Sequence, residues 1–302
     1  MHLKLLILEA DMIYSDLHCD SIARCFEKNE SLFDSRGHIN YFKIKQFTKF
    51  KQCFALFVDD GKRGDAAFSY FKKLVEFYES EIKKIKCDSL NAVLTAENGA
   101  CLGGDSNNVH YLAEKCVRML TLTWNGENEL ASGCLCDNGG LKPFGKDVIR
   151  KMEKAEIFID VSHLSEKSFY DVASLAASPL IASHSNCFSL VPHKRNLKDE
   201  QIKLIIESGG LIGLCFHAPF LLCDGFGSFE MLYRNINHVL SLGGEDAVCF
   251  GSDFDGGKPE KVLGSLQRVK NLYAYLVGRG LQKELLEKIF YKNAEKVFLC
   301  DT

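Results

Sequence analysis

The chain has 302 residues, of which 46% are hydrophobic and 25% are charged, and its formal net charge is -3. This composition is typical of a packed globular protein and excludes an intrinsically disordered chain. A pI near 6.3, without a dense run of Lys and Arg, gives no positive field to hold a phosphate backbone, so we expect no nucleic-acid partner.

The N-terminal segment gives no sign of export or of a membrane anchor. Its most apolar run, residues 5–8, is too short for a signal-peptide core and far below the roughly 20 residues of a membrane span. We therefore expect a cytoplasmic protein with no membrane partner. Residues 1–11 are predicted to be an extension, because the first strand follows directly after Met12. The 13 cysteines are odd in number and are expected to be reduced thiols.

Short apolar runs alternate with longer segments of helical periodicity, which is the pattern of βα units around a parallel sheet. The predicted strands are 13–18, 53–58, 92–96, 118–123, 157–161, 180–183, 211–216 and 247–251. The predicted helices are 66–85, 144–154, 166–176, 199–207, 229–242, 266–277 and 283–298. Eight strands in a chain of this length predict an α/β fold, a (β/α)8 TIM barrel that spans residues 1–302 as a single domain.

Residues able to bind metal follow the predicted strands, at the end where barrel enzymes place their active sites. They are His18, Asp20, Glu97, His163, His184 and Asp253. Alternate residues of an extended segment share a face, so His18 and Asp20 are predicted to point into the barrel mouth together. A single buried histidine is more often a core residue than a ligand. The ordered set nevertheless favours a metal site, since imidazole and carboxylate groups suit zinc.

A series of short motifs runs along the chain in the order SDLHCDS, TAENG, LTLTWN, GLKPFG, DVSHLS, SHSN followed by HKRN, and GSDFDG. As a set these motifs resemble the landmarks of the membrane (renal) dipeptidase family of zinc peptidases, from about Ile13 to the C-terminus. That family belongs to the amidohydrolase-like metal-dependent hydrolases, which agrees with the predicted barrel. The resemblance implies a metallodipeptidase that cleaves dipeptides, with L,D as well as L,L isomers as candidate substrates. It also implies two divalent metal ions per chain, with zinc preferred.

The resemblance further implies how the ligands divide. His18, Asp20 and a bridging Glu97 are implied for one ion, and Glu97, His163 and His184 for the other. A hydroxide that bridges two ions about 3.5–4 Å apart is the implied nucleophile, because metal binding lowers the pKa of water toward neutrality. Glu97 is therefore expected to be catalytic as well as a ligand.

Two further residues gain roles from the resemblance. Asp253 is implied as the proton shuttle from the nucleophile to the leaving amine, with Asp255 on the same face as the alternative. Arg195 matches the family's arginine that binds the C-terminal carboxylate of the substrate, to which a planar guanidinium presents two donors. The alternative for Arg195 is a surface position, since HKRN contains three basic residues.

The sequence departs from the family's pattern at one place. Where family members carry a histidine that steadies the scissile carbonyl oxygen, LTLT is followed here by Trp124 and then Asn125. Asn125 or His217 could supply the missing donor, and a packing role is equally open for either. Trp124 is expected to form a wall of the substrate pocket.

Two other functions compete with the dipeptidase hypothesis. A deaminase or lactonase could use the same metals on another substrate, although a carboxylate-binding Arg195 argues against it. A barrel that binds metal or peptide without turnover would need a defect in its site, whereas all the implied ligands and Asp253 are present. The resemblance also leads us to expect a homodimer.

Overall fold

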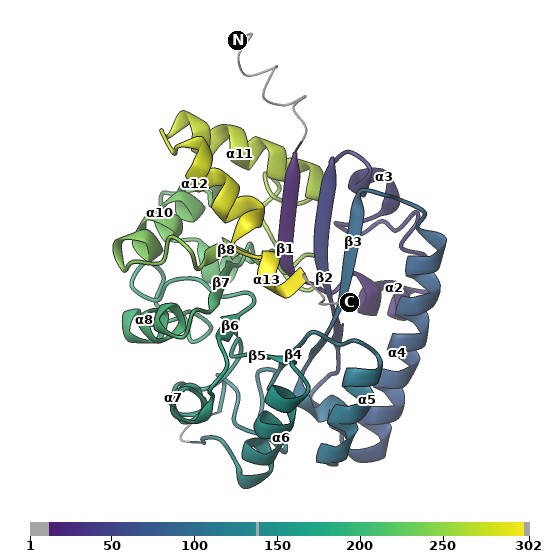
Figure 1. Cartoon of the computed structure of the whole chain (residues 1–302). Helices are drawn as coiled ribbons and strands as arrows, with labels where there is room; N and C mark the ends of the chain where they lie inside the picture. The colour runs from purple at the N-terminus through teal and green to yellow at the C-terminus, as the bar shows by residue number, and fades with distance from the viewer. Residues whose placement is uncertain (1–11, 137–138, 299–302) are drawn as a thin grey trace.

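The computed structural model describes residues 12–136 and 139–298, and these residues form eight parallel strands in one sheet. Neighbouring strands follow one another in chain order, with helices around the outside (Figure 1). The strands are β1 (Ile13–Cys19), β2 (Lys49–Phe57), β3 (Leu90–Glu97), β4 (Met119–Thr121), β5 (Phe158–Asp160), β6 (Leu180–Ala182), β7 (Leu211–Leu214) and β8 (Val248–Phe250). The predicted (β/α)8 TIM barrel is confirmed, and every predicted strand overlaps an observed one.

The first strand meets the segment after the last strand at the mouth of the barrel. The Asp253 N–H donates to the His18 carbonyl over 3.1 Å, and the Asp20 N–H donates to the Phe254 carbonyl over 2.8 Å. Cys19 and Phe254 form a parallel bridge at the same point. These bonds close the ring where the predicted metal ligands lie.

The described helices cover the outer face of the strands, which is why the strands read as continuous apolar runs. They are α2 (Ser21–Lys28), α3 (Tyr41–Ile44), α4 (Gly64–Lys84), α5 (Val109–Glu114), α6 (Pro143–Lys154), α7 (Glu166–Leu175), α8 (Asp199–Glu207), α9 (Ala218–Leu221), α10 (Ser228–Ser241), α11 (Val269–Gly278), α12 (Lys283–Glu287) and α13 (Glu295–Phe298). Within the described part of the chain, no helix has both the length and the hydropathy to cross a bilayer. The predicted extension at residues 1–11 lies outside the described residues.

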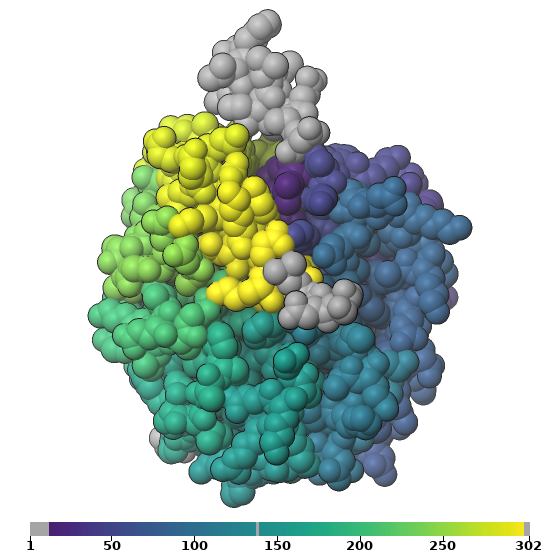
Figure 2. All heavy atoms as spheres, viewed as in Figure 1, coloured from purple at the N-terminus to yellow at the C-terminus, as the bar shows by residue number. Residues whose placement is uncertain are grey.

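The prediction of one continuous helix over residues 283–298 is wrong. The chain forms α12, then a π-helical turn at Lys288–Lys292, then α13. The side-chain amide of Asn293 donates to the carbonyl oxygens of Glu245 and Val248, each over 2.8 Å. This anchor ties the end of the π turn to β8, and the turn also contacts β1. The C-terminal segment therefore lies beside the N-terminal strands (Figures 1 and 2).

The interior of the barrel is apolar below the mouth. A buried cluster combines side chains from most of the strands with three from the C-terminal segment: Leu17, Cys53, Val93, Met119, Ile181, Leu211, Cys249, Ala294, Val297 and Phe298. The pairing of β1 with β2 shifts register between Asp16 and Cys19. Such an irregularity re-aims side chains, so Leu17 joins the interior cluster while the adjacent His18 reaches the mouth.

Asp16 joins β1 to the segment after β8. It is fully buried, and its Oδ1 accepts the N–H of His18 over 3.1 Å and the N–H of Ser252 over 2.9 Å. Its Oδ2 accepts the hydroxyl hydrogen of Tyr14 over 3.1 Å. A single side chain therefore satisfies backbone donors at both ends of the sheet, beneath the mouth.

We expect Asp16→Ala to lower the free energy of unfolding of the metal-free protein by ~3 kcal/mol. The substitution leaves buried backbone and hydroxyl donors without an acceptor, and each such loss costs about 1–3 kcal/mol. Urea denaturation measures the change, and the exposed Asp34→Ala is the control that should stay near wild type. A loss below about 1 kcal/mol for Asp16→Ala would contradict the assigned role.

Candidate metal centre

The structure brings the predicted metal-site residues together at the C-terminal ends of the strands. They are His18 at the end of β1, Asp20 just beyond it, Glu97 at the end of β3, His163 after β5, His184 after β6 and Asp253 after β8. All of them except the partly buried Asp253 are less than one-tenth exposed. Their potential ligand atoms fall into compact groups of three that a metal ion could occupy.

Glu97 offers one carboxylate oxygen to each side of this cluster. Its Oε1 lies 3.0 Å from His163 Nε2 and 3.8 Å from His184 Nε2. Its Oε2 lies 3.5 Å from His18 Nε2, which is itself 3.4 Å from Asp20 Oδ2. Both oxygens of one carboxylate thus face buried imidazoles that come from different strands.

Glu97, His163 and His184 form a first group, in which each imidazole has a polar partner at its Nδ1. His163 Nδ1 lies 2.9 Å from the amide oxygen of Asn125, and His184 Nδ1 lies 2.7 Å from Ser183 Oγ. The two Nε2 atoms then lie only 2.8 Å apart, next to Glu97 Oε1. Two ring nitrogens and a carboxylate oxygen attract one another only through a cation or proton between them, and neutral imidazole with carboxylate is a common zinc ligand set.

His18 and Asp20, beside Glu97 Oε2, form a second group, and it contains buried polar atoms without a partner among the described residues. Among the described residues, His18 Nε2 and Asp20 Oδ1 have no hydrogen-bond partner, although both are shielded from solvent. Such atoms are costly unless something pairs with them. A divalent cation bound there would satisfy both, so the donor set fits the metal that the sequence predicts.

The histidines differ in their preferred charge. Burial, with the nearby positive charges of Arg195 and His18, lowers the pKa of both His163 and His184 well below the usual value. Burial also opposes a charge on His18, but the carboxylates of Glu97 and Asp20 outweigh it and raise the pKa of His18. The neutral form required of a ligand is therefore favoured at two positions, whereas His18 must release a proton to a metal.

The carboxylates of the cluster repel one another. Burial and then the charge of Glu97 raise the pKa of Asp20 to about 6. Burial and then the charge of Asp20 raise the pKa of Asp253 well above its usual range. An arrangement that concentrates negative charge in a protein interior is stabilised by cations.

Comparison with known proteins agrees with this geometry. The sequence model of the family described as membrane dipeptidase (peptidase family M19) matches residues 4–300. The chain belongs to that family. The family is metal-dependent, which accounts for the buried groups of ligand type in this M19 protein.

Individual relatives cover the chain to different extents. An uncharacterised protein in the pqqA 5′ region of Klebsiella pneumoniae is 33% identical over 226 residues, which is 71% of this chain and 83% of that protein. Dipeptidase tcpJ of Claviceps purpurea is 32% identical over 220 residues, 70% of this chain. The match spans 50% of the length of this fungal relative.

Two solved structures share the fold of this M19 protein. The crystal structure of dipeptidase AC, a family M19 metallopeptidase, has a TM-score of 0.88 at 24% identity and covers 96% of this chain and 98% of its own. A Rhodobacter sphaeroides metallopeptidase, liganded with a phosphinate mimic of the dipeptide L-Ala-D-Ala, has a TM-score of 0.88 at 23% identity, with 96% and 99% covered.

Asp253 lies where the backbone is strained and closely covered. Its φ of 60° and that of His163, 70°, fall in the left-handed region that disfavours side chains. A Cβ on Gly256 would lie 2.1 Å from Asp20 Oδ2, and one on Gly257 would lie 2.7 Å from Asp253 Oδ2. Only glycine lets the chain pass this close over the two carboxylates, which is the physical reason for the glycine pair after GSDFD.

Asp255 is engaged elsewhere. Its Oδ2 accepts the hydroxyl hydrogen of Ser21 over 2.5 Å, and its Oδ1 accepts the N–H of His38 over 2.7 Å. Its carboxylate therefore anchors the segment after β1, whereas Asp253 lies with His18 and Asp20 in one potential ligand group.

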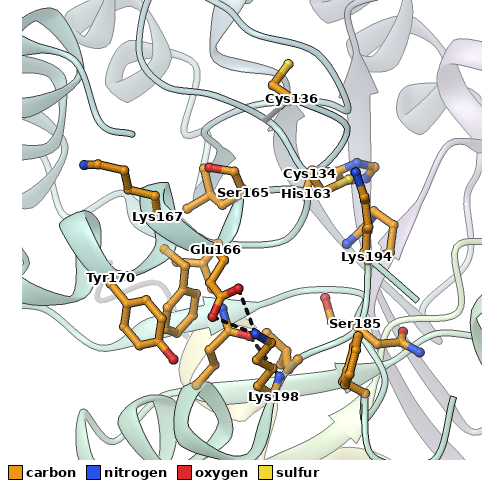
Figure 3. A pocket seen from close by; sticks show the side chains of 18 of the residues that line it. Cys134, Cys136, His163, Ser165, Glu166, Lys167, Tyr170, Ser185, Lys194 and Lys198 are labelled. Atoms are coloured by element: carbon orange, nitrogen blue, oxygen red, sulfur yellow. Dashed lines mark hydrogen bonds and ion pairs between the residues drawn. The ribbon is translucent and has the colours of Figure 1, made fainter. Parts of the chain in front are cut away.

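Arg195 lines a cavity of about 560 Å³. Figure 3 shows this cavity with others of its lining residues labelled. Arg195 is only 5% exposed, which excludes the surface position, and its Nη2 donates to the His184 carbonyl over 3.2 Å. Its Nε has no hydrogen-bond partner among the described residues, and its guanidinium lies 5.4 Å from the ring centre of Phe220. The cavity shares His163 with the metal cluster, and its rim carries the ion pair of Lys198 with Glu166.

The three remaining predicted residues occupy different places. Trp124 packs against Phe57 with ring centres 5.1 Å apart and lies 6.4 Å from the His163 ring. The Asn125 amide oxygen faces His163 Nδ1. His217 Nδ1 accepts the backbone N–H of Lys258 over 2.6 Å, which leaves the ring hydrogen on Nε2.

The electrostatic surroundings keep His217 neutral. Burial and then the charge of Arg195 lower the pKa of its imidazole to about 4. A neutral ring with one fixed N–H is suited to donate a hydrogen bond without acting as an acid at neutral pH.

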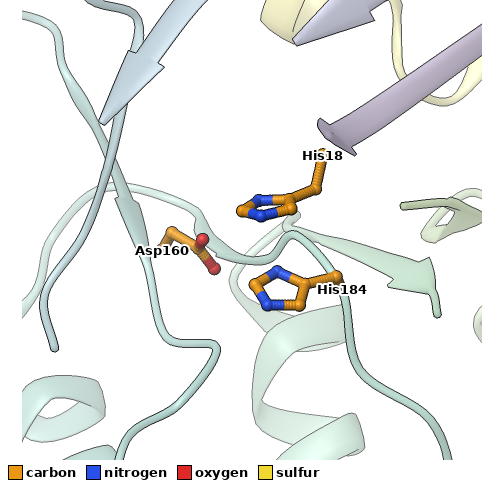
Figure 4. Close-up of side chains that lie close together, drawn as sticks. All are labelled: His18, Asp160 and His184. Carbon is orange, nitrogen blue, oxygen red and sulfur yellow. The ribbon is translucent and has the colours of Figure 1, made fainter. Parts of the chain in front are cut away.

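Asp160, which was not among the predicted site residues, lies beside the rings of His18 and His184 (Figure 4). An aspartate at the end of a short, otherwise apolar strand is unusual, because a buried carboxylate requires partners. That position within DVSHLS was the available signal.

We expect the affinity of this M19 protein for Zn²⁺ to fall as the pH drops. The raised pKa of His18 and the pKa of Asp20 of about 6 mean that acid adds protons to groups that must lose them to bind metal. Each displaced proton should weaken binding by up to about tenfold per pH unit, and the contribution of Asp20 should appear only below about pH 6. Chelator competition at each pH measures this change. The exposed His110→Ala variant should follow the wild-type curve, and a pH-independent affinity would contradict the prediction.

Proposed function

We propose that this protein is a metal-dependent dipeptidase that hydrolyses the peptide bond of dipeptides, with L,L and L,D isomers as candidate substrates. The observation that carries the proposal is the buried Arg195, which has no carboxylate partner among the described residues and lies against the backbone of the candidate ligand His184. A buried, unpaired cation at this place supports a role in binding an anionic group of the substrate.

Two divalent ions, zinc by preference, are proposed to occupy the cluster. His18, Asp20 and Glu97 Oε2 would hold one ion, and Glu97 Oε1, His163 and His184 the other. When bound, such a pair of ions would lower the pKa of water, which would supply a hydroxide nucleophile at neutral pH, and would polarise the scissile carbonyl. Support for zinc comes from the mixture of neutral imidazole and carboxylate ligands.

Arg195 is proposed to bind the C-terminal carboxylate of the substrate. Its contact with the His184 carbonyl keeps the guanidinium next to the cluster, so a carboxylate bound there lies within one residue of the reacting carbon. Binding energy from this remote contact orients the peptide bond. The same contact would exclude longer peptides, in which the chain continues beyond that residue.

Asp253 is proposed to move the proton. It would accept a proton from the attacking water and return it to the leaving nitrogen, which requires a carboxylate whose pKa is higher than usual. Burial and the neighbouring Asp20 raise the pKa of Asp253 in this way. The engagement of Asp255 by Ser21 and His38 favours Asp253 over Asp255 for this role.

His217 is our candidate for the donor to the scissile carbonyl oxygen in place of the missing histidine at Trp124. Its Nδ1 is occupied by Lys258, so its Nε2–H is the group that can donate. The Asn125 amide oxygen is already engaged by His163, which favours a positioning role for Asn125. The cytoplasmic location and the homodimer stay predictions.

The zinc-loaded protein should hydrolyse free dipeptides and discriminate strongly against their C-terminal amides. Arg195→Ala should remove this preference, since a lost charge-assisted hydrogen bond costs about 1.5–3 kcal/mol, or roughly 10- to 150-fold in kcat/KM. The matched control is Lys203→Ala, which removes one positive charge from an exposed side chain of α8 that does not line the cavity.

Two outcomes would count against this assignment. If Arg195→Ala still distinguishes free acid from amide as the wild type does, the carboxylate is bound elsewhere. If the zinc-loaded wild type cleaves no dipeptide in a panel of L,L and L,D isomers, the dipeptidase proposal is wrong. The deaminase, lactonase and non-catalytic alternatives would then be favoured.

Asp253→Asn should retain its metal ions and bind dipeptide almost normally, but turn over about 10²- to 10⁴-fold more slowly. Asparagine is similar in shape and cannot accept and return the proton. Elemental analysis and steady-state kinetics measure the two effects, with Asp255→Asn as the parallel variant. A near-normal kcat for Asp253→Asn together with a collapse for Asp255→Asn would reverse the two roles.

A further inference from the structure

Asp160 is a buried carboxylate whose accepting positions are filled within the described part of the chain. Its Oδ1 accepts the backbone N–H of Ser162 over 3.0 Å and that of Ser183 over 2.9 Å. Its Oδ2 accepts the hydroxyl hydrogens of Thr121 and Ser183, each over 2.5 Å. The side chain is fully buried, and it joins the ends of β4, β5 and β6.

Proximity alone would make Asp160 a metal ligand, because one of its oxygens lies within 4.8 Å of ligand atoms of His18 and His184 (Figure 4). Its hydrogen bonds argue otherwise. A carboxylate that already accepts from two N–H groups and two hydroxyls would have to give up some of these bonds to bind a cation. The geometry therefore suits a residue that orients the candidate ligands through hydrogen bonds and does not itself bind the ion.

The hydroxyl of Ser183 connects the Asp160 carboxylate to the His184 ring. Ser183 Oγ lies 2.5 Å from Asp160 Oδ2 and 2.7 Å from His184 Nδ1, and it has a single hydrogen to donate. A carboxylate oxygen can only accept, so that hydrogen belongs to the bond with Asp160. Ser183 Oγ also has two longer contacts, 3.4 Å to Ser162 Oγ and 3.5 Å to His18 Nδ1. The short contact with His184 must then run the other way, with His184 Nδ1–H donating to Ser183 Oγ.

This direction fixes the tautomer of His184. With its hydrogen on Nδ1, the ring presents a lone pair at Nε2, on the side that faces His163 Nε2 at 2.8 Å and Glu97 Oε1 at 3.8 Å. The opposite tautomer would place a hydrogen there and exclude a cation. A hydrogen bond to the far nitrogen is the usual way in which proteins orient a metal-binding histidine.

We propose that Asp160, acting through Ser183, is the positioning residue that commits His184 to metal binding. The two backbone N–H groups that Asp160 accepts also hold the ends of β5 and β6 in register, which sets His163 and His184 side by side. The inference rests on the proposed metal centre, and it concerns affinity for the ion rather than the bond that is cleaved.

The test is the metal affinity of Ser183→Ala. We expect zinc at the Glu97–His163–His184 group to bind about 10- to 100-fold more weakly. The His18–Asp20 group should be affected much less, because Ser183 Oγ is 3.5 Å from His18 Nδ1 but 2.7 Å from His184 Nδ1. Chelator competition on the metal-free protein would then resolve one tight and one weakened site. The matched control is Ser15→Ala, which removes an equally buried hydroxyl that has no hydrogen-bond partner among the described residues and should leave both sites unchanged.

A second measurement reads the tautomer of His184 directly. Long-range ¹H–¹⁵N spectra of the metal-free wild type should show His184 with its hydrogen on Nδ1. Asp160→Asn frees the Ser183 hydrogen to turn toward His184 and should shift the ring to the other tautomer. Wild-type spectra with the hydrogen on Nε2, or wild-type affinity at both sites in Ser183→Ala, would overturn the inference. Tight zinc binding without dipeptide hydrolysis would instead count against the proposed function alone.

Discussion

The carboxylate of Glu97 is the constraint on which the site depends, because each of its oxygens faces a different set of buried side chains. A charged group in such a position is tolerated only where the surroundings supply positive charge and directed hydrogen bonds. The barrel meets this requirement by ending its strands in a ring, so that His18, His163 and His184 approach Glu97 from separate directions.

Two further carboxylates connect the ends of neighbouring strands through hydrogen bonds. Asp16 joins β1 to the segment after β8, and Asp160 joins β5 to β6. In both cases one oxygen accepts the N–H two residues further along the chain and an N–H from the segment that follows the neighbouring strand. The candidate ligands therefore lie on backbone hydrogen bonds that are shared between strands, and this limits how far one of them can move independently of the next.

The sequence was sufficient for the order of the strands and for the residues that gather at the mouth, because apolar runs and strand-end positions are local properties. It was insufficient where the outcome depends on distant partners. Asp160 acquires its role from Thr121 and Ser183, which lie 39 and 23 residues away in the chain. The break in the C-terminal helix likewise depends on Asn293 finding carbonyl oxygens beside β8, which helical periodicity does not record. The sequence also could not decide whether Arg195, which lies in a basic segment, is buried or exposed, because its burial depends on residues that are distant in the chain.

The left-handed backbone at His163 and Asp253 lowers the stability of the fold at two positions whose side chains the candidate site requires. A glycine at either position would relieve strain of about 1–2 kcal/mol, yet it would remove a candidate ligand or the candidate proton shuttle. Changes that improve thermal stability at these two positions therefore come at the expense of the site. An engineer seeking a more robust variant would find the tolerant positions on the outer helices, away from the loops that follow β5 and β8.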